Sequence, residues 1–320
     1  MKKLIYSIFV LWLIGSGTLL AQNDDLTVLY TNSVRGVTFS EEGGNEKRVF
    51  AGLKLPEEGQ LRLRRGTQAR LLYHNHTLDL EGPARYTMTE LRQSMQKNSS
   101  DGFLSRFWSF VSNSIKETDD AEQVERYHRR YLTNARAGIS GFVGQESAIN
   151  APRYLTQAMD NPRLTFKWDS VPHPYGYHFT ITKETAIEPV FSAVTRTEGL
   201  TVNLSELMLQ PSAIYVWKVD ALQADSSELK SGSMHFSYEP EAEAYVNEIK
   251  EDNDFRQLSP QEQELYMLYR LEEGGLLHRA YRQYQQLSAD DSQAAYLYRK
   301  LFVSFLARMD ALEEAKSLVP

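Results

Sequence analysis

The chain of 320 residues contains no cysteine. Disulfide bonds, thiolate metal sites and lipid attachment to an N-terminal cysteine are therefore excluded. Basic residues are also in short supply, because 35 lysines and arginines stand against 42 acidic residues and give a net charge of −7. A nucleic-acid binder needs a basic face that displaces counterions from phosphate, so we expect no nucleic-acid partner.

What is present is typical of a globular protein with more than one core. The length favours two or three domains, and the hydrophobic share of 42% suits neither a disordered nor a membrane-embedded chain. The 18 tyrosines and 14 phenylalanines favour strand-rich packing. Residues 239–320 hold 16 acidic and 9 basic residues, which is the whole net charge of −7. This shift in composition predicts a domain boundary near Tyr238.

The N-terminus has the pattern of a secretory signal. Lys2 and Lys3 precede an apolar run from Leu4 to Ile14, and small residues follow as far as Ala21. This predicts a signal peptide at 1–21, cleaved after Ala21, and an exported protein of the bacterial periplasm or cell surface. The alternative is an uncleaved N-terminal anchor, although about 17 residues would be short for crossing a bilayer. We expect no stable membrane insertion after cleavage.

Residues 22–91 read as short strands divided by turns. Leu61 and Leu63 alternate with arginines, as in a half-buried strand, and turn signals occur at Gly59, Gly66 and Gly82-Pro83. The order of these glycines, prolines and strands resembles the FecR-like domain family. The resemblance implies an all-β domain and a link to envelope signalling.

Two histidines in this region raise the question of a metal site. His74 and His76 flank Asn75, which tolerates the left-handed conformation of a tight hairpin. No third ligand with suitable spacing stands nearby. We therefore predict a hairpin turn and no metal.

Residues 92–160 are expected to form a helical connector and a linker. Phe103, Phe107, either Phe110 or Val111, and Ile115 recur at helical spacing, which predicts a helix packed on a neighbouring β-domain rather than an interfacial membrane helix. A second, polar helix is expected at 121–132. The glycine-rich stretch 135–144 fits neither a phosphate-binding loop nor a nucleophile elbow around Ser140, so it is interpreted as a linker.

Residues 161–238 show five runs with period-two alternation, which predict an antiparallel β-sandwich. Trp168 and Trp217 alternate in phase with aliphatic residues and are therefore expected in the core rather than on an exposed sugar-stacking face. The run from Leu209 through Tyr215 to Ala221 resembles a fibronectin type III-like domain. That family implies spacing and protein contacts rather than catalysis.

Residues 239–320 are predicted to be helical, with helices at 261–273, 276–287, 292–309 and 310–318. Ser259, Pro260 and Glu262 form a helix-start signal with a capping box. Ala280 and Ala315 stand 35 residues apart, so the tail resembles one to two tetratricopeptide repeats. A plain helical hairpin bundle is the alternative.

The repeat resemblance implies a concave groove along the first helix of each pair. It assigns partner-binding positions to five residues, which are Glu262, Leu265, Tyr269, Lys300 and Ser304.

Together the patterns predict a multidomain protein: an all-β FecR-like domain, a helical connector, a fibronectin type III-like β-sandwich and a C-terminal α-helical repeat-like bundle. The expected function is non-enzymatic protein binding or scaffolding in the bacterial cell envelope, with no catalytic residue, cofactor or metal. The alternative is a FecR-related envelope sensor or regulator, although such a regulator needs a cytoplasmic segment and only Met1 to Lys3 precede the apolar run. A carbohydrate hydrolase that uses two carboxylates is the third possibility.

Overall fold

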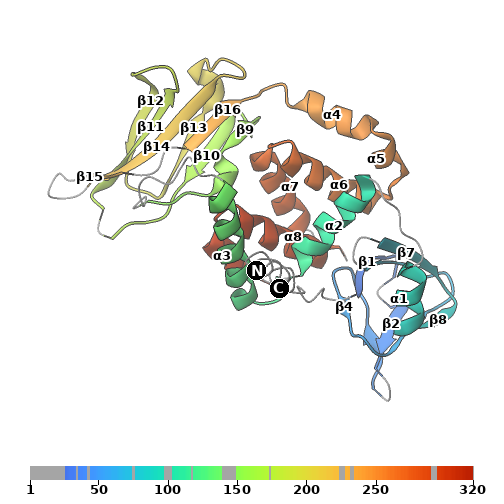
Figure 1. Ribbon diagram of the computed structural model, residues 1–320. Helices are drawn as coiled ribbons and strands as arrows, with labels where there is room; N and C mark the ends of the chain where they lie inside the picture. Colours follow the sequence, from blue (N-terminus) through green and yellow to red (C-terminus); the bar gives the residue numbers. More distant parts are fainter. Residues whose placement is uncertain are drawn as a thin grey trace, which may run out of the picture.

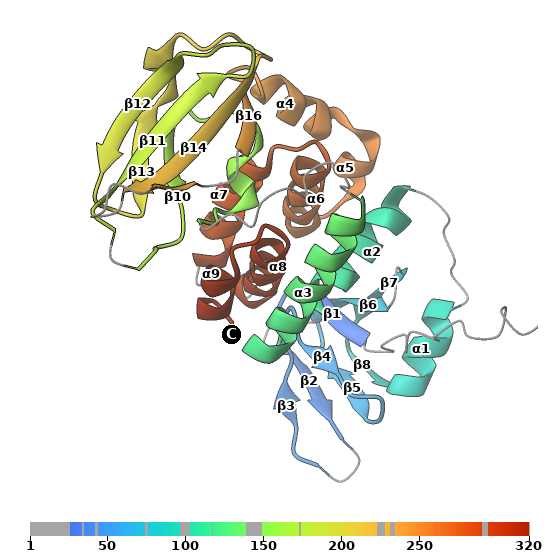
Figure 2. The same ribbon diagram turned by 60° about the vertical axis from the view of Figure 1, so that its left-hand side comes forward.

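The computed structural model describes residues 26–33, 35–41, 44–73, 76–96, 103–116, 118–138, 149–172, 174–222, 228–230, 234–289 and 294–319. The chain is a multidomain protein of mixed β-sheets and helices with a C-terminal helical region. The helices occupy the middle, between one group of strands at the N-terminal side and a larger group at the other (Figures 1 and 2). Within the described residues, no helix has the length and apolar character needed to cross a membrane.

The N-terminal β unit consists of two four-stranded sheets, in the orders β4-β1-β6-β7 and β3-β2-β5-β8. Leu61 and Leu63 of β5 are buried while Gln60 and Arg62 are exposed, so the predicted alternation is confirmed. A helix, α1, adds Leu91 to the same core. The elements are β1 (Leu26–Thr31), β2 (Val37–Ser40), β3 (Lys47–Arg48), β4 (Lys54–Leu55), β5 (Gln60–Leu63), β6 (Gln68–Tyr73), β7 (His76–Glu81), β8 (Ala84–Thr87) and α1 (Met88–Gln96).

The helical region is assembled from two separate parts of the sequence. Helices α2 and α3 come before the β-sandwich, and α4 to α9 follow it, yet α2 and α3 both pack against α8. The segment expected to be a connector is therefore an integral layer of the helical region, which is visible where α3 runs beside α8 (Figure 2). The helices are α2 (Phe103–Ile115), α3 (Ala121–Gly138), α4 (Glu243–Glu251), α5 (Asn253–Gln257), α6 (Pro260–Glu273), α7 (Leu277–Ala289), α8 (Ala295–Arg308) and α9 (Leu312–Ser317).

The spacing of apolar residues explains why α2 lies where it does. Phe107, Val111 and Ile115 form one face of the helix and are 0%, 0% and 1% exposed. A stripe of this kind is stable only when another surface covers it. Helix α8 supplies that surface and is itself buried along most of its length.

The larger group of strands forms two sheets that face each other. One contains β12-β11-β14-β16-β9 with β15 paired to β14, and the other contains β10 and β13. Phe166 of the smaller sheet packs on Trp217 and Phe179 of the larger one, with ring centroids 5.2 and 4.9 Å apart. The strands are β9 (Gln157–Met159), β10 (Arg163–Lys167), β11 (Gly176–Lys183), β12 (Pro189–Thr195), β13 (Gly199–Asn203), β14 (Ile214–Leu222), β15 (Glu228–Lys230) and β16 (Met234–Tyr238).

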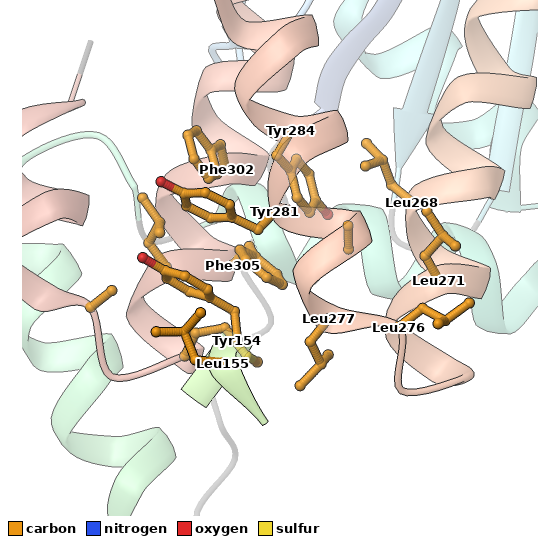
Figure 3. Close-up of a cluster of buried hydrophobic side chains, with 14 of the residues drawn as sticks. Tyr154, Leu155, Leu268, Leu271, Leu276, Leu277, Tyr281, Tyr284, Phe302 and Phe305 are labelled. Carbon is orange, nitrogen blue, oxygen red and sulfur yellow. The ribbon is translucent and has the colours of Figure 1, made fainter. Parts of the chain in front are cut away.

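A short strap, residues 149–160, fastens this sandwich to the helices. Its 3-10 turn η1 (Arg153–Leu155) presents Tyr154, which stacks on Tyr281 of α7 with centroids 4.1 Å apart (Figure 3). On its other side, the carbonyl of Leu155 accepts a hydrogen bond of 3.0 Å from the indole N–H of Trp217. Strand β9 then adds to the sheet in parallel with β16. Neither this strand nor the separate helices α4 and α5 were expected individually from the sequence.

Glycine is required where the strap meets the end of α6. Gly275 has a φ of +74°, and a Cβ there would lie 2.6 Å from the Gln157 side chain. The backbone N–H of Ala158 donates to the Gly275 carbonyl at 3.3 Å. The turn after α6 thus brings the helices and the sandwich into direct backbone contact.

Candidate interaction site

The five residues assigned to a partner groove do not line an open surface. Glu262, Leu265, Lys300 and Ser304 are between 0% and 2% exposed, and Tyr269 is half-buried. The expectation of an open groove at these positions is corrected by the structure. The reason is that other parts of the same chain cover the α6 and α8 faces.

Helix α2 and the turn after it cover the Tyr269 and Lys300 positions. The Tyr269 ring packs on Phe107 and Phe110 with centroids 5.8 and 5.1 Å apart, and its hydroxyl donates to Glu273 at 3.1 Å. Burial raises the pKa of Tyr269. Lys300 forms an ion pair with Asp119, which also receives a hydrogen bond of 2.5 Å from Lys54 of the β unit.

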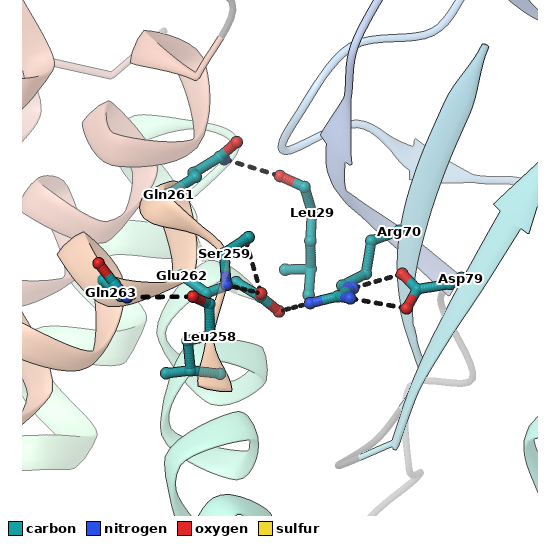
Figure 4. A network of polar contacts seen from close by, with 8 residues as sticks. All are labelled: Leu29, Arg70, Asp79, Leu258, Ser259, Gln261, Glu262 and Gln263. Atoms are coloured by element: carbon teal, nitrogen blue, oxygen red, sulfur yellow. Dashed lines mark hydrogen bonds and ion pairs between the residues drawn. The ribbon is translucent and has the colours of Figure 1, made fainter. Parts of the chain in front are cut away.

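The N-terminal β unit covers the Glu262 position. Arg70 of β6 forms an ion pair with Glu262, and it also donates to both carboxylate oxygens of Asp79 at 2.5 and 2.6 Å (Figure 4). The second oxygen of Glu262 accepts from the backbone N–H and the hydroxyl of Ser259, at 2.9 and 2.6 Å. The predicted capping box is therefore confirmed, and the same carboxylate joins the β unit to the helices.

Ser304 lies at the centre of a buried polar cluster. Its hydroxyl accepts a hydrogen bond of 2.7 Å from Arg308, which also forms an ion pair with Glu272. Tyr284 donates to the same Glu272 carboxylate at 2.8 Å. The charged groups of this cluster are paired with one another, so we assign the cluster a structural role within the helical bundle.

Other residues singled out from the sequence have clear positions. Trp168 and Trp217 are 4% and 2% exposed, so their assignment to the core is confirmed. His76 begins β7, whereas His74 and Asn75 of the hairpin tip lie outside the described residues, as do the signal segment 1–21 and most of the glycine-rich stretch. Within the described ranges, no group of three or more acidic or histidine side chains is arranged to hold a metal ion.

An open polar cleft of about 490 Å³ lies on another face of the helical region. Most of its lining comes from α7, and α4, α6 and the end of the strap contribute the rest. Arg279 spans the cleft and forms ion pairs with Asp160 at 2.8 Å and Glu243 at 2.5 Å. The lining residues are Asp160, Pro240, Glu243, Glu264, Arg279, Arg282, Gln283, Gln286 and Leu287.

The cleft is lined mainly by helical segments, and it carries both acidic and basic side chains. Arg282 and Gln286 lie one helical turn apart on α7 and are exposed, and Glu264 faces them from α6. On the same helix, burial and, to a smaller extent, the charge of Arg282 lower the pKa of His278 to about 4, against an opposing effect of Asp160. His278 is 7% exposed. The sequence analysis singled out none of these lining residues except as part of a predicted helix, because the cleft depends on the tertiary packing of α4, α6 and α7.

Comparisons with known proteins give no family assignment. No protein-family model matches the chain, and no curated protein matches it either. Among solved structures, a match is the crystal structure of a β-1,2-glucanase from Parabacteroides distasonis, with 11% identity and a TM-score of 0.23. The match covers 92% of this chain, and the chain spans about half, 48%, of the glucanase. A likeness this low carries no argument about fold or function.

Proposed function

We propose that the protein is an exported, non-enzymatic scaffold of the bacterial cell envelope that binds a protein partner through the cleft on α4, α6 and α7. The observation that carries this proposal is the row of Arg282, Gln283 and Gln286 on α7, the first and last of them exposed, in one cleft with the exposed Glu264 of α6. Side chains on rigid helices offer directional donors and acceptors without the entropy cost of ordering a loop. Three acidic and two basic residues in the lining favour a neutral or basic segment of the partner.

The finer domain assignments belong to the same proposal. Residues 22–91 would be the FecR-like domain, 161–238 the fibronectin type III-like domain and 239–320 the tetratricopeptide-like helices. The Tyr215 hydroxyl accepts a hydrogen bond of 2.9 Å from the backbone N–H of Gln210, the kind of contact that a tyrosine corner makes in such sandwiches. Ala280 and Ala315 are both 0% exposed, in keeping with close packing of paired helices.

Export is tested by intact-mass measurement on protein from the envelope fraction of a bacterial host. Removal of residues 1–21 should leave Gln22 at the N-terminus. A retained Met1 would favour an uncleaved anchor, and recovery of all the protein from the cytoplasm would contradict export.

Partner binding is tested by placing a photo-cross-linking amino acid in the cleft. The probe replaces Gln286, and the matched control places it at Gln285, which is exposed on the same helix but outside the cleft lining. In an envelope extract, the probe at 286 should give a discrete cross-linked protein, and excess unlabelled mature protein should suppress it. Equal cross-linking at 285 and 286, or none at either position, would contradict the cleft as the binding site.

A further inference from the structure

A cluster of four arginines lies on the N-terminal β unit, far in character from the acidic remainder of the chain. Arg62, Arg64, Arg65 and Arg85 are all exposed and line one cavity of about 420 Å³. No acidic residue occurs among the described residues of its lining, although the net charge of the chain is −7. The sheet that carries the cluster, β3-β2-β5-β8, is the one farther from the helices, because α2 packs on β6 and β7 of the other sheet (Figures 1 and 2).

Strand pairing places two of these arginines side by side. Arg62 of β5 and Arg85 of β8 are directly opposed, and the register of the two strands is unbroken. On its other side Arg62 is opposed by Thr38 of β2, which is in turn opposed by Arg48 of β3. Directly opposed residues lie on the same face of a sheet, so these four residues form one row across it. The row is on the outer face, since Leu61 beside it is buried in the core.

The charges of the cluster are largely uncompensated. Arg62 forms an ion pair of 3.0 Å with Glu46, but the two side chains are 45% and 47% exposed, and such pairs contribute little. Within the described part of the chain, Arg64, Arg65 and Arg85 form no ion pair. Like charges directly opposed on neighbouring strands destabilise a sheet. The pair of Arg62 with Arg85 therefore does not serve the stability of the β unit, and a bound anion would remove the repulsion.

The turn that carries Arg64 and Arg65 is held in place by hydrogen bonds. The carbonyl of Arg64 accepts from the backbone N–H and the hydroxyl of Thr67, at 3.1 and 2.6 Å. The backbone N–H of Gly82 donates to the Thr67 carbonyl at 2.8 Å, and a Cβ at Gly82 would lie 2.0 Å from the Arg64 carbonyl oxygen. Strand pairing and this turn thus fix the backbone under the arginines before any ligand binds, which lowers the entropy cost of binding.

We propose that this cavity binds a diphosphate group, at a site separate from the cleft on α7. The planar guanidinium fork of arginine donates to two oxygens of one phosphate, so neighbouring arginines can hold neighbouring phosphates. A phosphate carries roughly 1.5 to 2 negative charges near neutral pH, so two of them balance four arginines. A strand of nucleic acid fits less well, because no aromatic ring on which a base could stack occurs among the described lining residues.

The test is calorimetric titration of the chain from residue 22 to 320 with inorganic pyrophosphate, and separately with inorganic phosphate, at low salt. Pyrophosphate should bind about tenfold more tightly than phosphate, because it engages both pairs of arginines. Arg85→Glu should weaken pyrophosphate binding by about tenfold or more. The matched control, Arg163→Glu, makes the same charge change at an exposed position of β10 in the sandwich and should alter the affinity by less than about twofold.

Two further variants separate binding from folding. Arg85→Lys keeps the charge but loses the planar fork, so its affinity for pyrophosphate should fall between those of the wild type and Arg85→Glu. Arg64→Gln leaves the strand pairing untouched and should also weaken binding. The thermal midpoint of Arg85→Glu without pyrophosphate should not fall, because attraction to Arg62 replaces repulsion.

Vesicle sedimentation identifies the source of the diphosphate. Capture by phosphatidylcholine vesicles that contain a polyprenyl diphosphate, lost in Arg85→Glu and absent with phosphatidylcholine alone, would assign it to a lipid headgroup. Pyrophosphate binding without such capture would assign it to a soluble molecule. A wild-type chain that does not bind pyrophosphate overturns the proposal, as does an equal loss of affinity in Arg85→Glu and Arg163→Glu. Tighter binding of poly-glutamate than of pyrophosphate also overturns it, in favour of an acidic protein segment.

Discussion

Arg308 and Glu272 form a two-pronged ion pair inside the helical bundle, with one guanidinium nitrogen of Arg308 2.9 and 2.7 Å from the two carboxylate oxygens. Their side chains are only 10% and 11% exposed. Removing one partner of such a pair leaves a charge buried without compensation. We expect Glu272→Gln to lower the free energy of unfolding by about 3–5 kcal/mol, as measured by urea denaturation.

Replacing both partners should cost much less than replacing one. The double variant Glu272→Leu/Arg308→Met removes both buried charges together, so most of the loss should be recovered. As a control, Glu122→Gln breaks the exposed pair of Glu122 with Arg126 on α3 and should leave the stability unchanged. A double variant as unstable as the single one would show that Ser304 and Tyr284 depend on the ion pair for their own positions.

Gly52 lies where the N-terminal β unit touches α8, and it should resist substitution for two separate reasons. Its φ is +87°, and a Cβ would lie 2.7 Å from the ring of Tyr296. Gly66 has a similar φ of +76° but no atom near the place of a Cβ. Gly66→Ala should therefore cost about 1–2 kcal/mol from the backbone alone, and Gly52→Ala should cost at least about 1 kcal/mol more from the clash. Urea denaturation of both variants measures the difference, and equal losses would mean that α8 moves aside without cost.

Local patterns in the sequence were sufficient to predict most of the individual helices and strands. The alternation around Leu61, the capping box of Ser259 with Glu262, and the phase of Trp168 and Trp217 each depend on neighbours within a few residues. Their physical causes act over one turn or one pleat, so one sequence is enough to detect them. The expected helices from 261 onward were found with shifts of a few residues at their ends.

The prediction of an open groove was wrong because the segments that cover these positions are distant from them in the sequence. Lys300 was expected at a surface, yet its partner Asp119 is separated from it by about half of the sequence. A single clue was present, since the apolar stripe of α2 needed a surface of its own. Nothing in the sequence identified α8 as that surface, because such pairing depends on tertiary packing and not on local spacing.

His278 should make the stability depend on pH below neutrality. Its pKa is about 4 in the folded protein, against 6.5 for an ordinary histidine, because burial disfavours the charged ring. Between these values the unfolded chain binds a proton that the folded chain does not, so stability falls as the pH drops from 6.5 to 4. The loss from this group should reach roughly 3 kcal/mol.

The contribution of His278 is isolated by comparing slopes. His278→Gln should flatten the fall in unfolding free energy between pH 6.5 and 4, whereas His235→Gln should retain it, because the side chain of His235 is 37% exposed. Urea denaturation at several pH values gives both slopes. If the two variants behave alike, carboxylates elsewhere in the chain cause the acid sensitivity.

The ion pair of Arg70 with Glu262, which joins the β unit to α6, should contribute more to stability than the pair of Arg70 with Asp79, which lies within the β unit. The Glu262 side chain is 2% exposed and that of Asp79 is 65% exposed, so only the first carboxylate would be left buried without its cation. Arg70→Met should therefore cost about 1.5–3 kcal/mol, while Asp79→Asn should cost less than about 0.5 kcal/mol. Hydrogen exchange should also quicken in β1 and at the start of α6 for Arg70→Met alone, since the side chain of Gln261 donates to the Leu29 carbonyl across the same contact at 2.9 Å. If Asp79→Asn quickens exchange in β1 and at the start of α6 as much as Arg70→Met does, then Asp79 is needed to position Arg70. In that case the ion pair of Arg70 with Glu262 does not hold the β unit to the helices by itself.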